Sequence, residues 1–288
     1  MKRLSFRVPQ QEGVALVAVL WICLALSVMV VGVSNMLRSE IRIARDSQDA
    51  VLKSAIADAG IRMALIEMNQ QRTQRLSRIQ SRMYEFEGHT ISIDVVPLNG
   101  WINLNEASSG LIADALILGG GLSPDLARSI ADWVVQQRQL PAIDGGPRKM
   151  HSVEDLARAP GMHHEAFLAI QPLFTVDLQT GGAINPAAAP FEVLKVLSSG
   201  QDALAQQVLA SRQADGALVD FTRLQVGHSQ VSDSSAIQIE ARVAASDTTS
   251  VVRVWRVSMT GEAYGLPWRV LSIDPPKLVR TRPAAKPT

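Results

Sequence analysis

The sequence predicts an α+β protein in which a long N-terminal helix is followed by a mostly helical middle part and a β-rich final third. Three observations predict this order. Residues 14–74 contain no proline, and from residue 34 onward their apolar or small residues recur close to the 3.6-residue period of a helix. Helical patterns then fill much of residues 111–137. Within residues 89–96 and 236–259, apolar and polar residues alternate as they do in half-buried strands, and the polar residues 246–249 predict the turn of a hairpin in the second range.

Composition narrows the function classes. The chain has 288 residues, of which 47% are hydrophobic and 19% are charged, so it can bury a core and is not a disordered chain. The 28 basic residues nearly balance the 27 acidic ones, and a net charge of +1 argues against a nucleic-acid coat or a polybasic membrane binder. The single cysteine, Cys23, excludes an intrachain disulfide and any metal site built from several cysteines.

An uncharged run at residues 14–33 follows a polar leader, residues 1–13, that carries Lys2, Arg3 and Arg7. At ~1.5 Å per residue, a helix over this run spans the ~30 Å hydrocarbon core of a bilayer. A buried core helix would show a polar face, and a signal peptide would have a shorter apolar stretch that ends in a small-residue cleavage site. We therefore predict one membrane-spanning helix over residues 14–33, with the N-terminus inside and the bulk of the chain translocated.

The helix is predicted to continue past the membrane as an amphipathic segment, residues 34–74. A helix from Val14 to about Gln70 would be ~85 Å long. Its first third would lie in lipid, and its remainder would lie on a globular body.

A short charged leader that ends in glycine, an apolar helix and an amphipathic continuation together resemble the type IV pilin and pseudopilin family. The resemblance implies that a prepilin peptidase cuts between Gly13 and Val14 and that the new N-terminus is methylated. Family members normally carry Glu at the fifth mature position, where this chain has Ala18. A carboxylate in lipid needs a partner, which in pilins is the terminal amine of the neighbouring subunit. Without that carboxylate, this subunit cannot recruit a subunit beneath it in the usual way.

Among pseudopilins, the missing Glu resembles the K-type minor pseudopilins of type II secretion systems, the general secretion pathway protein K family. Four motifs in the body of the chain resemble the same family in the same order: N-L-N at 103–105, D-W at 132–133, P-G-M at 160–162 and A-P-x-E-V-L at 189–194. The resemblance covers most of residues 8–273. It implies a pilin-like fold, in which the N-terminal helix packs on an antiparallel sheet and a large, mostly helical domain is inserted in the head.

The resulting domain scheme follows the chain. It comprises the leader (1–13), the transmembrane part of the helix (14–33), its periplasmic part (34–74), pseudopilin strands (75–100), the inserted helical domain (101–225), C-terminal pseudopilin strands (226–274) and a disordered tail (275–288). Within the inserted domain, the stretch around Asn185 resembles the stretch around Asn103. This similarity suggests a weak internal repeat of two strand–turn–helix units.

No catalytic constellation is evident, and we expect the protein not to be an enzyme. His163 and His164 lack the spacing of a zinc-binding helix motif, and the other histidines are scattered. In relatives, acidic residues near the D-W motif belong to calcium sites, whereas here only Asp132 and the distant Asp144 remain. Because calcium takes ~6–8 oxygen ligands, we expect neither calcium nor any other cofactor to bind.

Residues 156–162 faintly resemble a helix-hairpin-helix, a module that binds DNA phosphates through glycine amides. The hairpin lacks the second glycine, and only Arg158 adds positive charge within the motif. We therefore expect no nucleic-acid partner.

The resemblance implies a minor pseudopilin that caps the tip of the type II secretion pseudopilus, helps to initiate its assembly and supports export of folded proteins across the outer membrane. The implied partners are the I- and J-type minor pseudopilins, the major pseudopilin, prepilin peptidase and the inner-membrane assembly platform. The implied location is the bacterial inner membrane, with a single pass, a cytoplasmic N-terminus and a periplasmic head. Two alternatives stay open: a membrane-anchored periplasmic enzyme or ligand-binding protein, and a minor pilin of a related type IV pilus.

Overall fold

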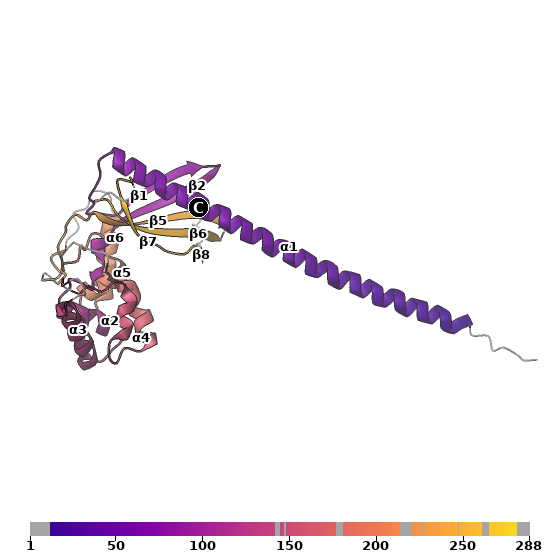
Figure 1. Ribbon diagram of the computed structural model, residues 1–288, viewed down its shortest axis with the longest axis horizontal. Coiled ribbons are helices and arrows are strands. Elements are labelled where there is room, and N and C mark those ends of the chain that lie inside the picture. The colour runs from indigo at the N-terminus through magenta and orange to yellow at the C-terminus, as the bar shows by residue number, and fades with distance from the viewer. Residues whose placement is uncertain are drawn as a thin grey trace, which may run out of the picture. The chain divides into compact units, whose positions relative to one another are not determined.

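The computed structural model describes residues 12–141, 145–146, 148–176, 181–213, 221–225, 227–246, 248–260 and 265–280. The chain divides into two compact units, residues 1–52 and residues 53–288. The first helix, α1 (Glu12–Gln70), contributes to both units (Figure 1). The predicted long N-terminal helix is therefore confirmed over the described residues, and it ends just before Arg72, whose φ of 55° is incompatible with continuation of the helix.

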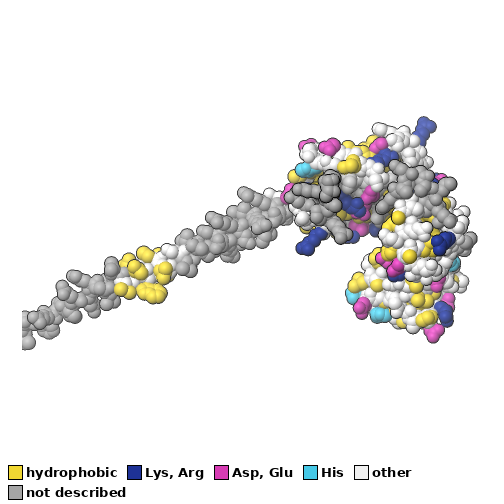
Figure 2. Space-filling view, turned by 180° about the vertical axis from the view of Figure 1, so that it is seen from behind, with side chains coloured by type: hydrophobic (Ala, Val, Ile, Leu, Met, Phe, Trp, Pro, Cys, Tyr) yellow, Lys and Arg dark blue, Asp and Glu magenta, His cyan; other side chains and the backbone are white. Residues whose placement is uncertain are grey.

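The first unit consists of the N-terminal part of α1. Its described large apolar side chains, among them Val17, Leu20 and Trp21, are exposed, and Figure 2 shows a yellow band of hydrophobic side chains on the helix. Residues 1–11 of the predicted leader lie outside the described residues, as do the side chains of Val14, Ala18 and residues 30–33. Over the side chains that are described, no helix combines the length and apolar character needed to cross a bilayer.

The second unit contains an antiparallel sheet that confirms the predicted α+β fold. Its strands lie in the order β1 (Gln80–Phe86), β2 (His89–Pro97), β5 (Ala236–Ser246), β6 (Thr249–Ser258) and β7 (Arg269–Ile273). The strand predicted within residues 89–96 and the hairpin predicted in the final third are both confirmed. Strand β1 lies within the range expected for pseudopilin strands, residues 75–100, but no local pattern marks it, because polar and charged residues occupy most of its sequence, QSRMYEF.

Helix α1 packs its C-terminal part on one face of this sheet. Ile61, Leu65 and Met68 are fully buried in one core cluster with Ile91 and Ile239 from the strands. The helix needs a small residue where it crosses β2. A Cβ atom added at Gly60 would lie 2.8 Å from Cγ2 of Ile91, so glycine at this position permits the close approach.

The chain between β2 and β5 forms a second, mostly helical layer with its own core. Its helices are α2 (Ser109–Leu118), α3 (Pro124–Gln139), α4 (His164–Ile170), α5 (Phe191–Leu197) and α6 (Asp202–Gln213). A short parallel pair, β3 (Ile102–Asn103) and β4 (Phe174–Thr175), and three 3-10 helices, η1 (Leu98–Gly100), η2 (Val153–Arg158) and η3 (Gln171–Leu173), complete it. In Figure 1 these helices gather on one side of the sheet. We call this layer, residues 98–235, the helical insertion.

One sequence-based expectation is wrong. Residues 275–288 were predicted to be a disordered tail, but Lys277–Arg280 form strand β8, which pairs with Thr249–Val252 of β6. Strand β7 pairs only with residues 255–258 of β6, so the first half of the long β6 offers a free edge. The chain returns to that edge after Pro275 and Pro276, which supply no N–H group to a ladder. Residues 281–288 lie outside the described residues.

Candidate functional site

Two buried asparagines bind the start, the middle and the end of the helical insertion to one another and to the bend before β1. The side-chain amide of Asn185 donates to the carbonyl oxygens of Ser77 (2.7 Å) and Ser232 (3.0 Å) and to Oδ1 of Asn99 (3.3 Å). Asn99 in turn donates from Nδ2 to the Ser232 carbonyl oxygen at 2.9 Å and to its Oγ at 3.1 Å. Asn185 is 0% exposed and Asn99 is 1% exposed. We call Asn99, Asn185 and Ser232 the asparagine clasp, because it links the segment that enters the insertion to the segment that leaves it.

The backbone around the clasp is tightly packed. A Cβ atom at Gly100 would lie 2.5 Å from the carbonyl carbon of Ala188 and 2.8 Å from the amide nitrogen of Ala189. Both are backbone atoms that cannot move aside as a flexible side chain can. The direct hydrogen bond from the Asn185 N–H to the Asn99 carbonyl oxygen, 2.7 Å, reinforces the same contact. The clasp thus holds the segments that enter and leave the insertion close together, beside the bend that precedes β1.

The internal repeat suggested by the sequence has a structural counterpart. Asn103 accepts the N–H of Asn105 at Oδ1, and its carbonyl oxygen accepts the N–H groups of residues 106 and 107. Asn185 accepts the N–H of Ala187 at Oδ1, and its carbonyl oxygen accepts those of residues 188 and 189. In both repeats the next helix begins six residues after the asparagine: α2 after Asn103 and α5 after Asn185.

An arginine side chain donates a hydrogen bond to each of these two asparagine turns. Arg138, at the end of α3, donates to the carbonyl oxygen of Ala107 at 2.7 Å, and Arg212, at the end of α6, donates to that of Ala189 at 2.7 Å. Each acceptor is the fourth residue after the asparagine of its unit. Arg212 also donates to the carbonyl oxygen of Pro186. Burial lowers the pKa of Arg138. It also lowers the pKa of Arg212, to about 10, which leaves the Arg212 guanidinium charged at neutral pH.

Polar contacts also tie α1 to the strands. Asp58 accepts from Nε of Arg253 (2.9 Å), from Nη2 of Arg253 (3.1 Å) and from the indole N–H of Trp255 (2.9 Å). Farther along the helix, Glu67 accepts the Tyr84 hydroxyl and forms an ion pair with Arg82 at 2.8 Å. The hydrogen bond from Tyr84 has the largest effect and holds the pKa of Glu67 below its ordinary value. Burial, the next largest effect, raises this pKa, and the charge of Arg82 lowers it further.

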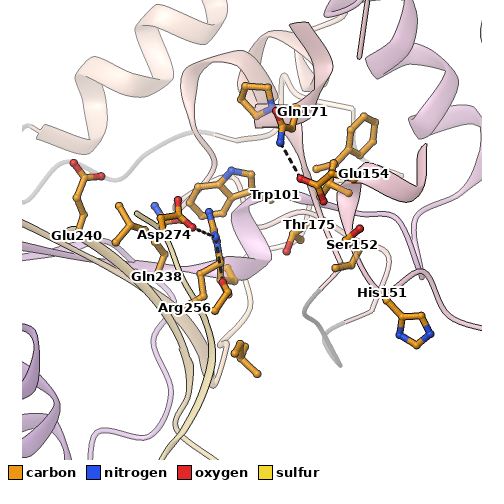
Figure 3. A pocket seen from close by; sticks show the side chains of 18 of the residues that line it. Trp101, His151, Ser152, Glu154, Gln171, Thr175, Gln238, Glu240, Arg256 and Asp274 are labelled. Atoms are coloured by element: carbon orange, nitrogen blue, oxygen red, sulfur yellow. Dashed lines mark hydrogen bonds and ion pairs between the residues drawn. The ribbon is translucent and has the colours of Figure 1, made fainter. Parts of the chain in front are cut away.

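A hollow of about 650 Å³ lies between the helical insertion and the sheet face that α1 leaves free (Figure 3). One wall comes from strands β5 to β7 and the start of β8, and includes Gln238, Arg256 and Asp274. The other wall comes from residues 151–154 and 171–176 of the insertion. Figure 3 shows the Trp101 ring between the two walls.

Several polar side chains that line this hollow bind one another. Arg256 pairs with Asp274 at 2.8 Å, and Gln171 donates to Glu154 at 3.1 Å. The hollow can therefore hold a ligand or a polypeptide segment by shape, apolar contact and hydrogen bonds.

The residues singled out from the sequence lie apart from these features. Gly13 and Val14 lie in the first turn of α1, and the side chain of Ala18 is outside the described set, so the predicted cleavage site remains a prediction. Asp132 is exposed on α3, and Asp144 lies outside the described residues. Among the residues that the structure describes, no group of three or more His, Cys, Asp or Glu side chains could hold a metal ion.

Sequence reasoning missed the clasp as a unit. Asn185 was recognised as a turn residue, but Asn99 and Ser232 are far from it in the chain and belong to no motif. The available signal was the pairing of Asn103 and Asn185 in two similar stretches. That similarity indicated a turn at Asn185 but did not indicate its partners or its burial.

Comparison with known proteins gives a likeness in structure. No family model matches the chain, and no curated protein matches it. The fold is similar to a chain of the crystal structure of the GspK–GspI–GspJ complex from the type 2 secretion system of enterotoxigenic Escherichia coli. The TM-score is 0.47 and the sequence identity 15%, and the alignment covers 82% of this chain and 98% of that chain.

Proposed function

We propose that this protein is a K-type minor pseudopilin that caps the tip of a type II secretion pseudopilus. The proposal rests on one observation: this chain combines the N-terminal features of a pseudopilin with a helix-on-sheet head that carries a helical insertion. An apolar helix follows a charged leader that ends in Gly13, and the fifth residue after that glycine is Ala18 instead of Glu. The C-terminal part of the same helix packs on an antiparallel sheet, and a helical insertion separates β2 from β5.

In this proposal, residues 14–33 hold the protein in the bacterial inner membrane until assembly, with the head in the periplasm. The helix then packs against the helices of partner subunits, including the I- and J-type minor pseudopilins. Two features favour a terminal position. The helical insertion makes the head too wide for the shaft of a filament, and the absence of a carboxylate at Ala18 removes the usual means of recruiting the next subunit.

The leader is tested by mass spectrometry of the mature protein. Cleavage after Gly13 and one added methyl group on Val14 are the expected result, and Gly13→Leu should block the cut because a side chain obstructs a narrow peptidase site. An intact N-terminus in a cell that processes its other pseudopilins would contradict the proposal.

The position in the pseudopilus is tested by labelling the full-length protein in assembled filaments. Label at one end only is the expected result, whereas label along the shaft would contradict the role as a cap. Restoring the family's carboxylate with Ala18→Glu should shift some of the label into the shaft.

The hollow between the insertion and the sheet favours a second candidate function, a membrane-anchored periplasmic ligand-binding protein. Its volume of about 650 Å³ lies within the ~300–1,000 Å³ range of small-molecule sites. The two functions are separated by one comparison on the full-length protein. A defined complex with the I- and J-type pseudopilins supports the first, and a rise in melting temperature with a periplasmic metabolite extract but not with those proteins supports the second.

A further inference from the structure

The two edges of the sheet are built differently. At one edge, two short strands pair with β6: the five-residue β7 and the four-residue β8. A register shift between Arg256 and Val257 interrupts the β6–β7 pairing, and Pro275-Pro276 separates β7 from β8. Short strands, irregular pairing and prolines are the devices that prevent another chain from adding to an edge. That edge is therefore protected.

The other edge has none of these devices among the described residues. Strand β1 pairs with β2 over seven consecutive positions without a register shift, contains no proline, and has no second strand beside it. Glu87 and Gly88, with φ of 50° and 72°, form the two-residue turn that joins β1 to β2. The result is a long, regular edge of the kind that accepts an added strand.

The turn determines which backbone groups are free. In a two-residue hairpin, the flanking pair, here Phe86 and His89, is hydrogen-bonded, and bonded and non-bonded pairs alternate from there along an antiparallel ladder. Residues 82 and 84 therefore direct their N–H and C=O groups toward β2. Ser81, Met83 and Glu85 direct theirs toward the open edge.

The side chains of β1 are already held in place, whereas its apolar surface is not covered. Ser81 donates to Asp94 at 2.6 Å, Thr90 donates to Glu85 at 2.9 Å, and Arg82 and Tyr84 contact Glu67 of α1. Met83, in contrast, is 73% exposed in the middle of the strand. Ile79, just before β1, is 42% exposed, and Phe86 at its end is 38% exposed.

We infer that the β1 edge binds an extended strand of a partner pseudopilin, which adds to the sheet next to Gln80–Phe86. The chemistry of the edge specifies the occupant: three outward N–H and C=O pairs require an extended polypeptide backbone, and Met83 requires an apolar side chain opposite it. The inference rests on the proposed function, since a single copy at a tip has only other pseudopilins as neighbours.

The inference is tested first without any substitution, by hydrogen exchange of the full-length protein in detergent, alone and co-purified with the I- and J-type pseudopilins. The amides of residues 81, 83 and 85 should exchange at least tenfold more slowly in the complex. Those of residues 82 and 84, already bonded to β2, should change less than twofold. Unchanged exchange at residues 81, 83 and 85 within a stable complex would overturn this inference and leave the proposed function intact.

A pair of variants then separates backbone from side-chain contacts. Met83→Pro removes an outward N–H without touching the β1–β2 ladder, and it should lower the yield of the complex at least tenfold. Met83→Ser keeps that N–H and removes only the apolar side chain, so it should lower the yield two- to threefold. Equal yields from Met83→Pro and the unchanged protein would overturn the inference. A complex that fails to form with the unchanged protein would overturn both proposals, and protection only in a self-associated form would assign the edge to a second copy of this chain.

Discussion

Replacing Asn185 with Ala is expected to destabilise the head strongly, because it removes the side chain that several buried polar groups of the asparagine clasp bind. The truncation removes the donor to the Ser77 carbonyl oxygen and to Oδ1 of Asn99, and the acceptor for the Ala187 N–H. The Ser232 carbonyl oxygen keeps the hydrogen bond from Asn99. Three polar groups at a fully buried site therefore lose the hydrogen bond that Asn185 supplied.

A buried polar group left without a partner costs ~1–3 kcal/mol, and local relaxation recovers part of that cost. We expect a loss of about 3–4 kcal/mol for the three groups together. With ~2–4 °C per kcal/mol for a chain of this size, the melting temperature should fall by roughly 6–16 °C. Asn185→Asp should be at least as damaging, because it keeps the acceptor for Ala187 but loses both donors and buries a charge.

The assay is thermal unfolding of the full-length protein in detergent, followed by circular dichroism. Gln171→Ala is the matched control: it removes a single side-chain hydrogen bond to Glu154 in an exposed environment, and it should change the free energy of unfolding by less than ~0.5 kcal/mol. A fall of less than about 2 °C for Asn185→Ala would refute the reasoning. That result would mean that water or a shifted backbone satisfies the clasp groups.

Three further predictions concern the helix–sheet contacts and the packing at the clasp. Asp58→Asn should lower the stability of the head by about 2 kcal/mol in urea unfolding, because it leaves a partly buried guanidinium without its carboxylate; an unchanged midpoint would contradict this role. Glu67 stabilises the folded state fully at pH values above the pKa that its carboxyl has in the unfolded chain, and this stabilisation is lost as the pH falls through the lower pKa of the folded state. Glu67→Gln should therefore flatten the decline of the melting temperature below about pH 5. A parallel decline in both proteins would show that Glu67 does not contribute. Gly100→Ala should lower the free energy of unfolding by about 2–3 kcal/mol, because the new Cβ atom would meet backbone atoms. At Gly110 no atom lies within 4 Å of an added Cβ atom, so Gly110→Ala should raise the free energy of unfolding by ~0.5–1 kcal/mol through α2. Equal effects of the two glycine substitutions would refute the packing argument.

Local patterns in the sequence predicted most of the regular elements. The start of α3 follows from Ser123-Pro124, and the β5–β6 hairpin follows from two alternating runs that flank a polar turn. These signals are local, since a helix bonds within itself and a tight hairpin joins neighbours in the chain. Strand β1 carried no such signal, because only one side of it is partly covered and polar residues are therefore tolerated there.

Long-range contacts could not be predicted in the same way. Asn99 and Asn185 are 86 residues apart in the chain, and Asp58 and Arg253 are 195 residues apart. Nothing in either neighbourhood specifies the partner, because a buried polar group can be satisfied by any donor or acceptor that the fold brings to it. The hollow beside Trp101 has the same origin, since its walls come from segments that meet only when the helical insertion lies against the sheet.

The sequence by itself determined the order of the elements, the uncharged run at residues 14–33, the alanine at position 18 and the two similar asparagine turns, because each depends on residues close together in the chain. Only the tertiary structure decided that β8 fills the free half of β6, that the asparagine clasp attaches the insertion, and that β1 is left as the open edge. Strand pairing and burial are settled by competition among distant segments for the same backbone groups and the same apolar surface. The local sequence of one segment therefore does not determine which distant segment pairs with it or covers it.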